Sequence, residues 1–294
     1  FIAIQYFPDD FELKTKDTTL YFKSDHYEAN IKGLSSEEFP LVPEVKKDKK
    51  FSLPALQFKE AVGQVVFAAA TDETRPVLTG VLVLAQGDFL TFVATDSYRL
   101  AEKKVKLAQK VDQVISAIVP ARAIAEIGRI IDETIDMIEV VIGENQIQFT
   151  IGATQIISRL IEGKFPDYQQ IIPQKVVTKA HVDRLQFINS LKMASFFARE
   201  VANNIKIKTD TKDNLEVIAV SPQIGENHTK INAEIEGGQL EIAFNAKFLS
   251  DGLQVMNSEK VSLGLSGAMA AGVLKPSKSD GGFLYIVMPL KLEE

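Results

Sequence analysis

The chain has 294 residues, which is long for one hydrophobic core, and its 46% apolar and 24% charged residues are typical of folded globular domains. It contains no cysteine, which excludes disulfides, thiolate metal sites and cysteine nucleophiles and agrees with a cytoplasmic protein. Its net charge of −6 excludes a general attraction to phosphate, and its apolar runs are too short to span a bilayer, so any contact with nucleic acid has to be local.

The first predicted elements, in residues 11–40, are strands. The stretch FELKTKDTTLYFKSDHYEANIKGLSSEEFP has the pattern of a hairpin with a polar turn, then a further strand and a loop that closes on Phe-Pro. A helix is predicted over 54–70, because apolar residues recur there at helical spacing from Leu56 to Val66 and Pro54 suits a first helical turn.

Two β-rich runs come next, VLTGVLVLA and FLTFVATD, with Gly87 and two polar neighbours between them. Polar residues around a glycine are typical of a turn, so we expect the chain to reverse there. A second helix is predicted from Pro120, because isoleucines recur on one face, and further strands are predicted over 138–161.

A repeat of about 126 residues organises the chain. The two Phe-Pro loops end at Pro40 and Pro166, and other segments recur at almost the same offset. The matching segments are 11–40 with 138–166, 90–97 with 215–222, and 118–131 with 243–256. The repeat also predicts a second helix pair over 181–199 and 245–257. Each module is then two helices on one face of mainly antiparallel strands, an α+β fold.

The repeat divides the chain into three modules, whose boundaries we predict at residues 1–48, 51–173 and 176–294. Residues 1–50 match only the second half of a module, so about 75 residues would precede them in a complete first module. We therefore expect the sequence, which begins with Phe1, to start inside a domain.

One stretch raises the question of catalysis, because VATDSYRL (93–100) presents a carboxylate, a hydroxyl, a phenol and a guanidinium in succession. Neighbouring residues of a strand point to opposite faces, so these groups cannot all converge on one substrate. No histidine is near them in the sequence, and His26, His181 and His228 lack the spacing of metal ligands. We expect no catalytic site, no metal and no cofactor.

Five motifs together carry a family resemblance. They are TDETRPVLTGV (71–81), VATDSYRLA (93–101), EGKFPDYQQIIP (162–173), FNAKFLSDGL (244–253) and YIVMPLKL (285–292). In this order on a tandem repeat they closely resemble the β subunit of bacterial DNA polymerase III, the replicative sliding clamp. The resemblance implies DNA-clamp modules, a head-to-tail homodimer closed into a ring around duplex DNA, and no chemistry. It implies as partners the DNA, the polymerase α subunit, the clamp loader and other proteins with a clamp-binding motif.

The resemblance also implies a pocket between the second and third modules that binds short peptides from polymerases and the clamp loader. Apolar anchors in such a pocket supply the affinity, and a few polar groups orient the peptide. The residues that match the family's pocket are Leu78, Thr95, Ser97, Tyr98, Arg99, Leu100, Pro166, Ile171, Ile286, Met288, Pro289, Leu290 and Lys291. Taken singly, each apolar residue also fits an ordinary core.

Three basic residues are candidates for contact with DNA. Arg122 and Lys247 occupy equivalent positions of the repeat, in the first turn of a predicted second helix. Cations are unfavourable at a helix N-terminus, so their recurrence points to a phosphate partner, with a solvated surface charge as the simple alternative. The resemblance adds Arg75, in the family's loop beside the DNA channel. Such contacts go to the DNA backbone and read no sequence.

For the dimer interface the resemblance implies Glu28, Phe196 and Phe197, with inward packing of both phenylalanine rings as the alternative. Closure joins the third module of one subunit to the first of the other, so we expect the chain as given not to close a stable ring. Two other functions stay open: a clamp-like scaffold that binds peptides without encircling DNA and, more distantly, a hydrolase built on Asp96 and Ser97.

Overall fold

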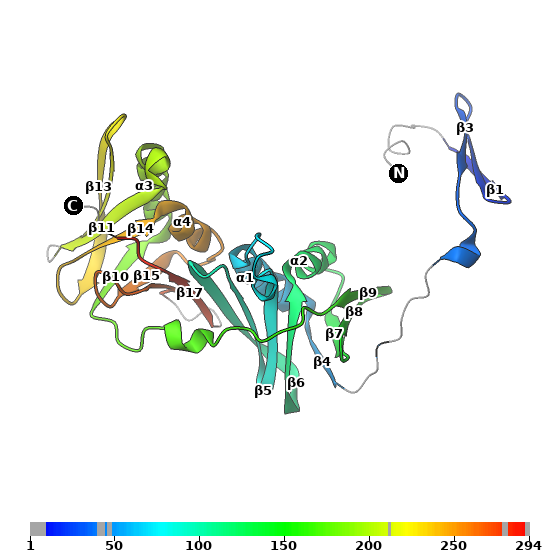
Figure 1. The fold of residues 1–294 in the computed structure, drawn as a ribbon, viewed down its shortest axis with the longest axis horizontal. Helices are drawn as coiled ribbons and strands as arrows, with labels where there is room; N and C mark the ends of the chain where they lie inside the picture. The colour runs from blue at the N-terminus through cyan, green and yellow to red at the C-terminus, as the bar shows by residue number, and fades with distance from the viewer. Residues whose placement is uncertain (1–9, 40–44, 46–48, 211–212, 278–281, 292–294) are drawn as a thin grey trace. The chain divides into compact units, whose positions relative to one another are not determined.

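The computed structural model describes residues 10–39, 45, 49–210, 213–277 and 282–291 (Figure 1). The chain divides into two compact units, Phe1–Glu44 and Val45–Glu294. Most of the stretch where we predict the first module boundary, 40–44 and 46–48, lies outside the described residues, as do residues 1–9. Within the described ranges no helix is both long and apolar enough to cross a membrane.

The first unit is an antiparallel sheet with the strand order β1-β2-β3. Its elements are β1 (Glu12–Lys16), β2 (Thr19–Lys23), β3 (Glu28–Lys32) and the short helix η2 (Ser36–Glu38). This arrangement confirms the hairpin and further strand predicted for 11–40. Among the unit's described residues only Thr19 and Phe22 are buried, so its own core is small.

Residues 49–159, the central block, begin with a strand that runs directly into a helix. The helices are α1 (Ala55–Val65), extended by η3 (Val66–Ala68), and α2 (Ala121–Ile130). The strands are β4 (Lys49–Pro54), β5 (Gly80–Thr95), β6 (Arg99–Pro120), β7 (Met137–Ile142), β8 (Gln146–Ile151) and β9 (Thr154–Arg159). Both helices start after a proline, as predicted, and β4, β7, β8 and β9 form a four-stranded sheet.

The turn predicted around Gly87 is not a separate element between two strands, because β5 continues as one strand from Gly80 to Thr95 and changes direction within it. Gly87 has a φ of 59°, and the pairing of β5 with β6 shifts register on both sides of it. The left-handed glycine therefore serves a β-bulge, which bends the hairpin instead of ending the strand. The bend brings the ends of β5 together: Arg75, shortly before the strand, donates through Nη1 to Oγ of Ser97, just after it, at 3.0 Å.

Residues 178–287, the C-terminal block, repeat this plan. The helices are α3 (Arg184–Ala198), extended by η6 (Arg199–Val201), and α4 (Ala246–Gln254). The strands are β10 (Thr178–Asp183), β11 (Asn204–Asp210), β12 (Asn214–Ser221), β13 (Gly225–Glu236), β14 (Leu240–Asn245), β15 (Lys260–Leu265), β16 (Gly272–Pro276) and β17 (Phe283–Val287). The predicted second helix pair is confirmed, and β12 is the predicted counterpart of the end of β5.

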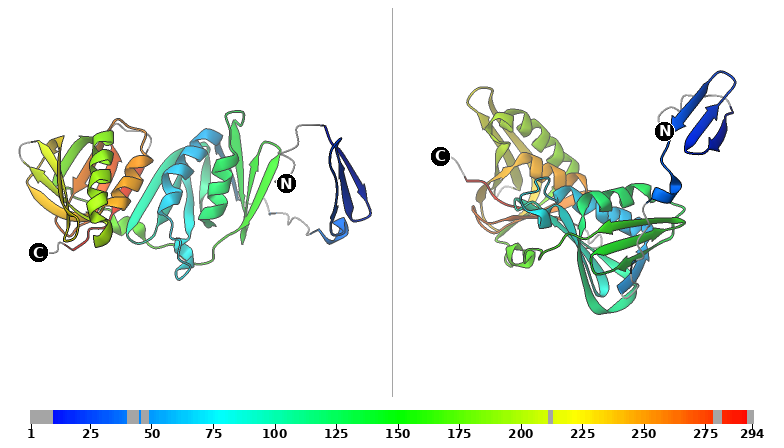
Figure 2. Two further views of the ribbon diagram at one scale, coloured as in Figure 1. Left: turned by 90° about the horizontal axis from the view of Figure 1, so that it is seen from above. Right: turned by 45° about the vertical axis from the view of Figure 1, so that its right-hand side comes forward.

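One ten-stranded sheet crosses from block to block in the order β14-β11-β12-β13-β10-β15-β16-β17-β6-β5. The crossing point is the antiparallel pair of β17 and β6, in which Ile286 lies opposite Leu100. Helices α1 and α2 pack on each other, as do α3 and α4, and both pairs lie on one side of the sheets (Figures 1 and 2). This is the predicted α+β fold.

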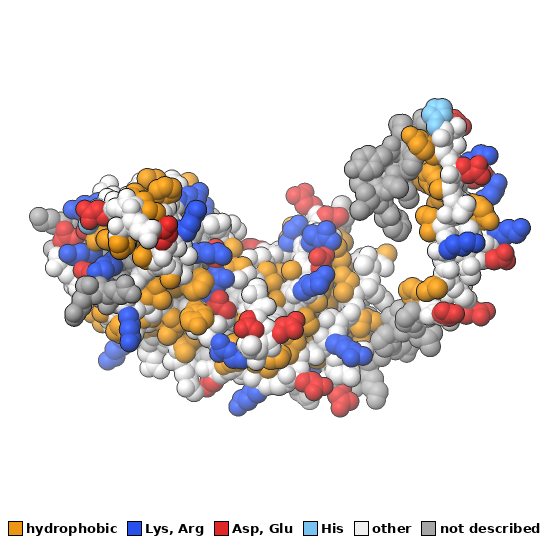
Figure 3. All heavy atoms as spheres, turned by 45° about the horizontal axis from the view of Figure 1, so that its top comes forward, with side chains coloured by type: hydrophobic (Ala, Val, Ile, Leu, Met, Phe, Trp, Pro, Cys, Tyr) orange, Lys and Arg blue, Asp and Glu red, His pale blue; other side chains and the backbone are white. Residues whose placement is uncertain are grey.

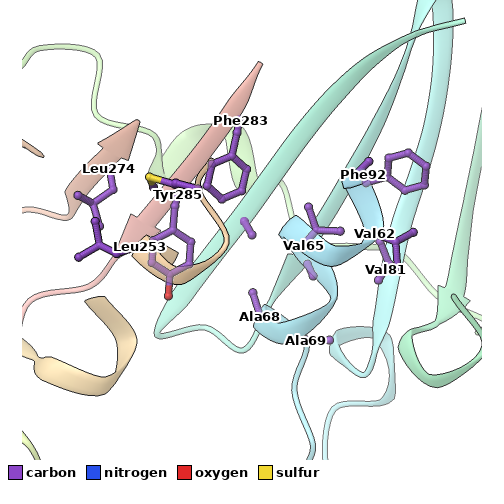
Figure 4. Close-up of a cluster of buried hydrophobic side chains, with 14 of the residues drawn as sticks. Val62, Val65, Ala68, Ala69, Val81, Phe92, Leu253, Leu274, Phe283 and Tyr285 are labelled. Atoms are coloured by element: carbon purple, nitrogen blue, oxygen red, sulfur yellow. The ribbon is translucent and has the colours of Figure 1, made fainter. Parts of the chain in front are cut away.

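The main core lies between the helices and the sheets, and a single connected cluster of apolar side chains spans both blocks (Figure 4). In the central block, Phe58 of α1 packs edge-on against Phe92 of β5, with ring centroids 5.5 Å apart. In the C-terminal block, the buried ring of Tyr285 on β17 lies against Gly252 of α4, where a Cβ would come within 2.3 Å of the ring. The helices can therefore approach the sheet closely.

Candidate functional site

A second apolar cluster, which we call the junction cluster, lies where the two blocks meet. It is built by β5, β6, β16, β17 and the linker between the blocks (160–177). Its buried members are Leu82, Val93, Leu100, Ile118, Phe165, Tyr168, Ala271, Val273, Leu284 and Ile286. Along β17, Leu284 and Ile286 belong to this cluster, whereas Phe283, Tyr285 and Val287 belong to the main core. Since strand side chains alternate, the junction cluster covers the face of the sheet opposite the helices.

The linker is fixed to this face by two aromatic side chains. Phe165 and Tyr168 are buried in the junction cluster, and Tyr168 begins the short helix η5 (Tyr168–Ile171). The Tyr168 phenol lies close to Glu102, a buried residue of β6. Burial raises the pKa of Tyr168 and the neighbouring Glu102 raises it further, so the phenol keeps its proton at neutral pH.

The polar side chains of the turn between β5 and β6 form hydrogen bonds within the turn itself. Asp96 accepts from the backbone N–H groups of Tyr98 and Arg99, both at 2.9 Å, and the Thr95 hydroxyl donates to the Arg99 carbonyl at 2.7 Å. Ser97 has a left-handed φ of 78°, and its hydroxyl accepts from Arg75. No hydrogen bond among the described residues joins Ser97 to a histidine, so the geometry does not activate it as a nucleophile.

Arg99 points inward and joins the two blocks. Its guanidinium donates to Asp96 from Nε (3.0 Å), to Asp251 of α4 from Nη1 and to the Phe67 carbonyl from Nη2 (3.1 Å). It also lies over the Phe248 ring, 4.7 Å from the centroid, and the side chain is only 12% exposed. The resemblance places Arg99 in the pocket wall; in the structure these contacts occupy its guanidinium, so it supports the turn from inside.

The C-terminal segment, 288–291, is tied to both blocks. Met288 donates its amide to the carbonyl of Tyr98, and Leu290 donates to Ala243 of β14, both at 2.8 Å. Tyr98 and Met288 are 61% and 37% exposed, and the Tyr98 ring stacks on Phe248 with centroids 6.3 Å apart. An exposed aromatic ring beside an adaptable thioether is a surface suited to apolar peptide side chains.

The structure divides the predicted pocket residues by exposure. The buried ones are Leu78, in the short helix η4 (Pro76–Leu78), and Thr95, Leu100 and Ile286. The exposed ones are Ser97, Tyr98, Pro166, Ile171, Met288 and Lys291, and the intermediate ones are Arg99, Pro289 and Leu290. The buried residues have the character of a floor and the exposed ones that of a rim.

Two of the cavities in the second unit flank the predicted set. The larger, about 940 Å³, lies between the linker and β5 and β6 and includes Pro166 but no other predicted pocket residue. The smaller, about 290 Å³, is lined by the 69–75 loop and includes Tyr98 and Arg99. Neither includes Leu100 or Met288, so the predicted pocket is not itself one of these cavities.

Sequence reasoning does not select Phe248 or Tyr168, although the structure places both in this region. A signal for each exists in the sequence. In the repeat Phe248 stands where the central block has Ala123, and a large aromatic in place of a small residue indicates a new contact. Tyr168 lies in the quoted Phe-Pro motif three residues after Phe165, a spacing that lets both aromatic rings bury on the same surface.

Arg122 and Lys247 lie in the first turns of α2 and α4, and both are exposed. Neither belongs to an ion pair recorded among the described residues, whereas Arg129, also on α2, pairs with Glu126. Figure 3 shows the side of the molecule that carries the helices, with lysine and arginine side chains at several separate places among apolar and acidic ones. Arg75 is exposed too, although one of its nitrogens donates to Ser97.

The two phenylalanines near the end of α3 have different surroundings. Phe196 is 60% exposed, whereas Phe197 packs against the main core, and the rings meet edge-on with centroids 5.5 Å apart. Inward packing, the alternative for both rings, therefore applies to Phe197 alone. Glu28 is exposed on β3 of the first unit.

Family models match most of the second unit. The central domain of the DNA polymerase III beta subunit matches residues 52–167, and the C-terminal domain of the same subunit matches residues 169–291. The beta sliding clamps of Staphylococcus aureus and Staphylococcus epidermidis are each 36% identical to the chain over 270 residues, which is 91% of this chain and 71% of the relative.

Solved structures give the same result. The DNA polymerase sliding clamp of Bacillus subtilis matches with a TM-score of 0.93 and 29% sequence identity. The match covers 99% of this chain and 78% of the Bacillus subtilis chain. The DNA polymerase III beta subunit of Thermotoga maritima matches with a TM-score of 0.92 and 26% sequence identity. That match covers 99% of this chain and 79% of the Thermotoga maritima chain. Sequence identity over most of both chains and a shared fold lead to one conclusion: the chain belongs to the bacterial β sliding clamp family.

Proposed function

We propose that the chain works as a DNA sliding clamp, part of a ring that encircles duplex DNA and tethers a polymerase to it. The observation that carries the proposal is the 36% identity to β sliding clamps over 91% of the chain. A tether needs binding surfaces but no reaction centre. The β5–β6 turn supports a non-catalytic role, since Asp96 and Thr95 use their polar groups to hold the backbone.

Duplex DNA would contact the helices. Arg122 and Lys247 offer exposed cations at equivalent positions of α2 and α4, where the helix dipole alone would disfavour them. Contacts from separate cations to phosphates hold DNA at any sequence. Because the net charge of the protein is −6, the protein as a whole does not attract DNA, and binding is limited to these local contacts. Weak, sequence-independent holding is what a protein that slides requires.

Partner proteins would dock at the junction between the blocks through short peptides. The buried side chains of Leu100 and Ile286 form an apolar floor, and Tyr98 and Met288 form an exposed rim above the same strand pair. Arg99 and the β17–β6 pairing hold this surface in place before a peptide arrives. A preformed surface spares a short peptide part of the ordering cost of binding.

Self-association would use the exposed ring of Phe196 on α3 together with Phe197, and Glu28 on the first unit. A large apolar ring in water on an otherwise folded helix is a common mark of a protein contact. Phe196→Asp would therefore lower the apparent mass in analytical ultracentrifugation if the protein self-associates. Leu185→Asp, at an equally exposed apolar residue about three turns away near the start of α3, is the matched control.

Retention on DNA tests the ring. Protein with a complete first module, placed on a nicked circular plasmid by a clamp loader, is expected to stay bound during gel filtration at high salt, and to be lost once the plasmid is cut. Blocking both ends of the cut plasmid with streptavidin should restore retention, because a ring can leave only over a free end. Equal loss from circular and cut DNA, with peptide binding intact, would identify the alternative, a peptide-binding scaffold that does not encircle DNA.

A further inference from the structure

The cavity of about 940 Å³, here called the linker groove, lies on the face of the sheet that carries the junction cluster. Leu82 and Leu84 of β5 and Ile118 of β6 form its floor, and the linker forms its wall. Gly163 fixes the path of that wall. Its φ of 128° suits glycine alone, and a Cβ there would come within 2.7 Å of Val77 in η4.

The linker groove borders the proposed peptide site. Leu82 and Ile118 of its floor belong to the same junction cluster as Leu100 and Ile286 of the peptide site. Pro166 lines the groove and is also one of the predicted pocket residues. The linker groove is therefore near enough to meet residues that flank a peptide anchored at this site.

The rim of the linker groove is acidic. Glu144, Glu162 and Asp167 line it, against one cation, Lys164. Gln170 donates to Asp167 at 2.7 Å, but none of the ion pairs or side-chain hydrogen bonds recorded among the described residues involves Glu144 or Glu162. Two free carboxylates beside an apolar floor favour a ligand that carries positive charge for the rim and apolar groups for the floor.

The wall of the linker groove also offers backbone groups. Leu160 and Ile161 donate to Asn145 and Ile118, but no backbone hydrogen bond is recorded for residues 162–165 among the described part of the chain. An extended peptide can pair with such a segment by main-chain hydrogen bonds, while its side chains reach the floor and the rim. The groove thus fits an extended basic peptide better than a helix or a compact small molecule.

We propose that the linker groove binds a basic, extended segment next to the apolar anchor of a partner's clamp-binding peptide. The inference rests on the proposed peptide site and adds to it a second determinant, the charge of the flank. Partners with lysine or arginine beside the anchor would bind more tightly than partners with an acidic flank. Competition among partners for one clamp would then depend on salt as well as on the anchor.

Fluorescence anisotropy with the clamp-binding peptide of a bacterial polymerase tests this inference. Five probes are compared: the bare peptide, and versions with three lysines or three glutamates added at either end. One lysine version should bind about three- to tenfold more tightly than the bare peptide at low salt, as expected for a few exposed ion pairs, and the gain should fade by about 0.5 M salt. The glutamate version at the same end should bind more weakly than the bare peptide.

Charge reversal in the groove provides the matched variants. Glu144→Lys with Glu162→Lys should abolish the gain and leave the bare peptide unaffected, whereas Glu226→Lys, an exposed glutamate of β13 outside the groove, should preserve it. Equal affinity of all five probes, or a gain that survives the double reversal, would overturn the proposal. The bare peptide could fail to bind while a lysine version still binds and still responds to the double reversal. That outcome would refute the proposed peptide site but support basic-segment binding in the linker groove. Ring formation is tested separately by retention on circular DNA.

Discussion

Arg99 donates to Asp251, a residue 152 positions further along the chain, and so links the β5–β6 turn of the central block to helix α4 of the C-terminal block. The same guanidinium bonds Asp96 and the Phe67 carbonyl and lies over Phe248. One side chain thus connects the loop that carries Tyr98 to both blocks. The blocks are held together by this contact as well as by the shared sheet.

Replacement of this arginine should destabilise the protein strongly. Arg99→Ala leaves Asp96 and Asp251 without their cation in a largely buried place, and we expect a loss of about 3 kcal/mol in the free energy of unfolding, measured by denaturant titration. Arg99→Lys should recover little, because an ammonium lacks the planar fork that reaches three acceptors and stacks on Phe248. Arg129→Ala, which removes an exposed pair, should cost less than about 1 kcal/mol. Equal losses for Arg99→Ala and Arg129→Ala would refute the proposed link.

Two helical glycines should respond to alanine in opposite directions. A Cβ at Gly252 would meet the buried Tyr285 ring at 2.3 Å, so Gly252→Ala should destabilise by about 2 kcal/mol or more through overpacking. A Cβ at Gly63 in α1 would have no neighbouring atom within 4 Å, so Gly63→Ala should stabilise by about 0.5–1 kcal/mol through helix propensity. Thermal unfolding of both variants checks the pair. The same sign for both would show that the approach of α4 to β17 is looser than described.

Peptide binding should depend on the rim of the junction. We expect a polymerase peptide to bind with a Kd near the micromolar range, or about −8 kcal/mol. Met288→Ala and Tyr98→Ala should each weaken it at least fivefold, since each removes an exposed apolar contact without disturbing the core. Met193→Ala, an exposed methionine of α3, should have no effect. Isothermal titration of the folded variants gives the comparison, and unchanged binding in the Tyr98 and Met288 variants would place the peptide elsewhere.

DNA affinity should fall when either helix cation is lost. Arg122→Ala and Lys247→Ala should each reduce the slope of log K against log salt by about 0.9, the value for one released counterion at a duplex phosphate. Lys275→Ala should leave the slope unchanged, because Lys275 is exposed on β16, a strand of the sheet, and not on a helix. Titrations at several salt concentrations with two unrelated duplexes measure the slopes. A variant that changes affinity for only one duplex would contradict backbone contact.

Much of the fold could be predicted from the sequence because it is built from local signals that recur. Pro54 and Pro120 announce both helices of the central block, and the repeat carries the pattern into the C-terminal block. At Gly87 the local signals do not decide the structure. A glycine with positive φ between two β-rich runs fits a turn and a bulge equally well, and only the pairing of β5 with distant residues of β6 decides between them.

The sequence selects candidate site residues but does not reveal the contacts they make. The motif order selects Arg99 and Met288 together, yet the inward direction of Arg99 depends on Asp251 and Phe248, which are remote in sequence. Tyr168 is buried beside Glu102, a charged residue that sequence patterns would place in water. Partners of this kind are decided by the tertiary structure, so local patterns do not reveal them.

The joint between β6 and β17 also determines how the protein responds to mechanical load. Hydrogen bonds between antiparallel strands run perpendicular to the strand axes. A pull on the C-terminal segment along β17 therefore loads the strand pair in shear. In this geometry every bonded pair from Phe283–Lys103 to Val287–Arg99 is strained at once. A pull across the strands would instead open the pairs one by one. If a polymerase docks at Met288 as proposed, it would thus exert force along β17 without peeling the two blocks apart.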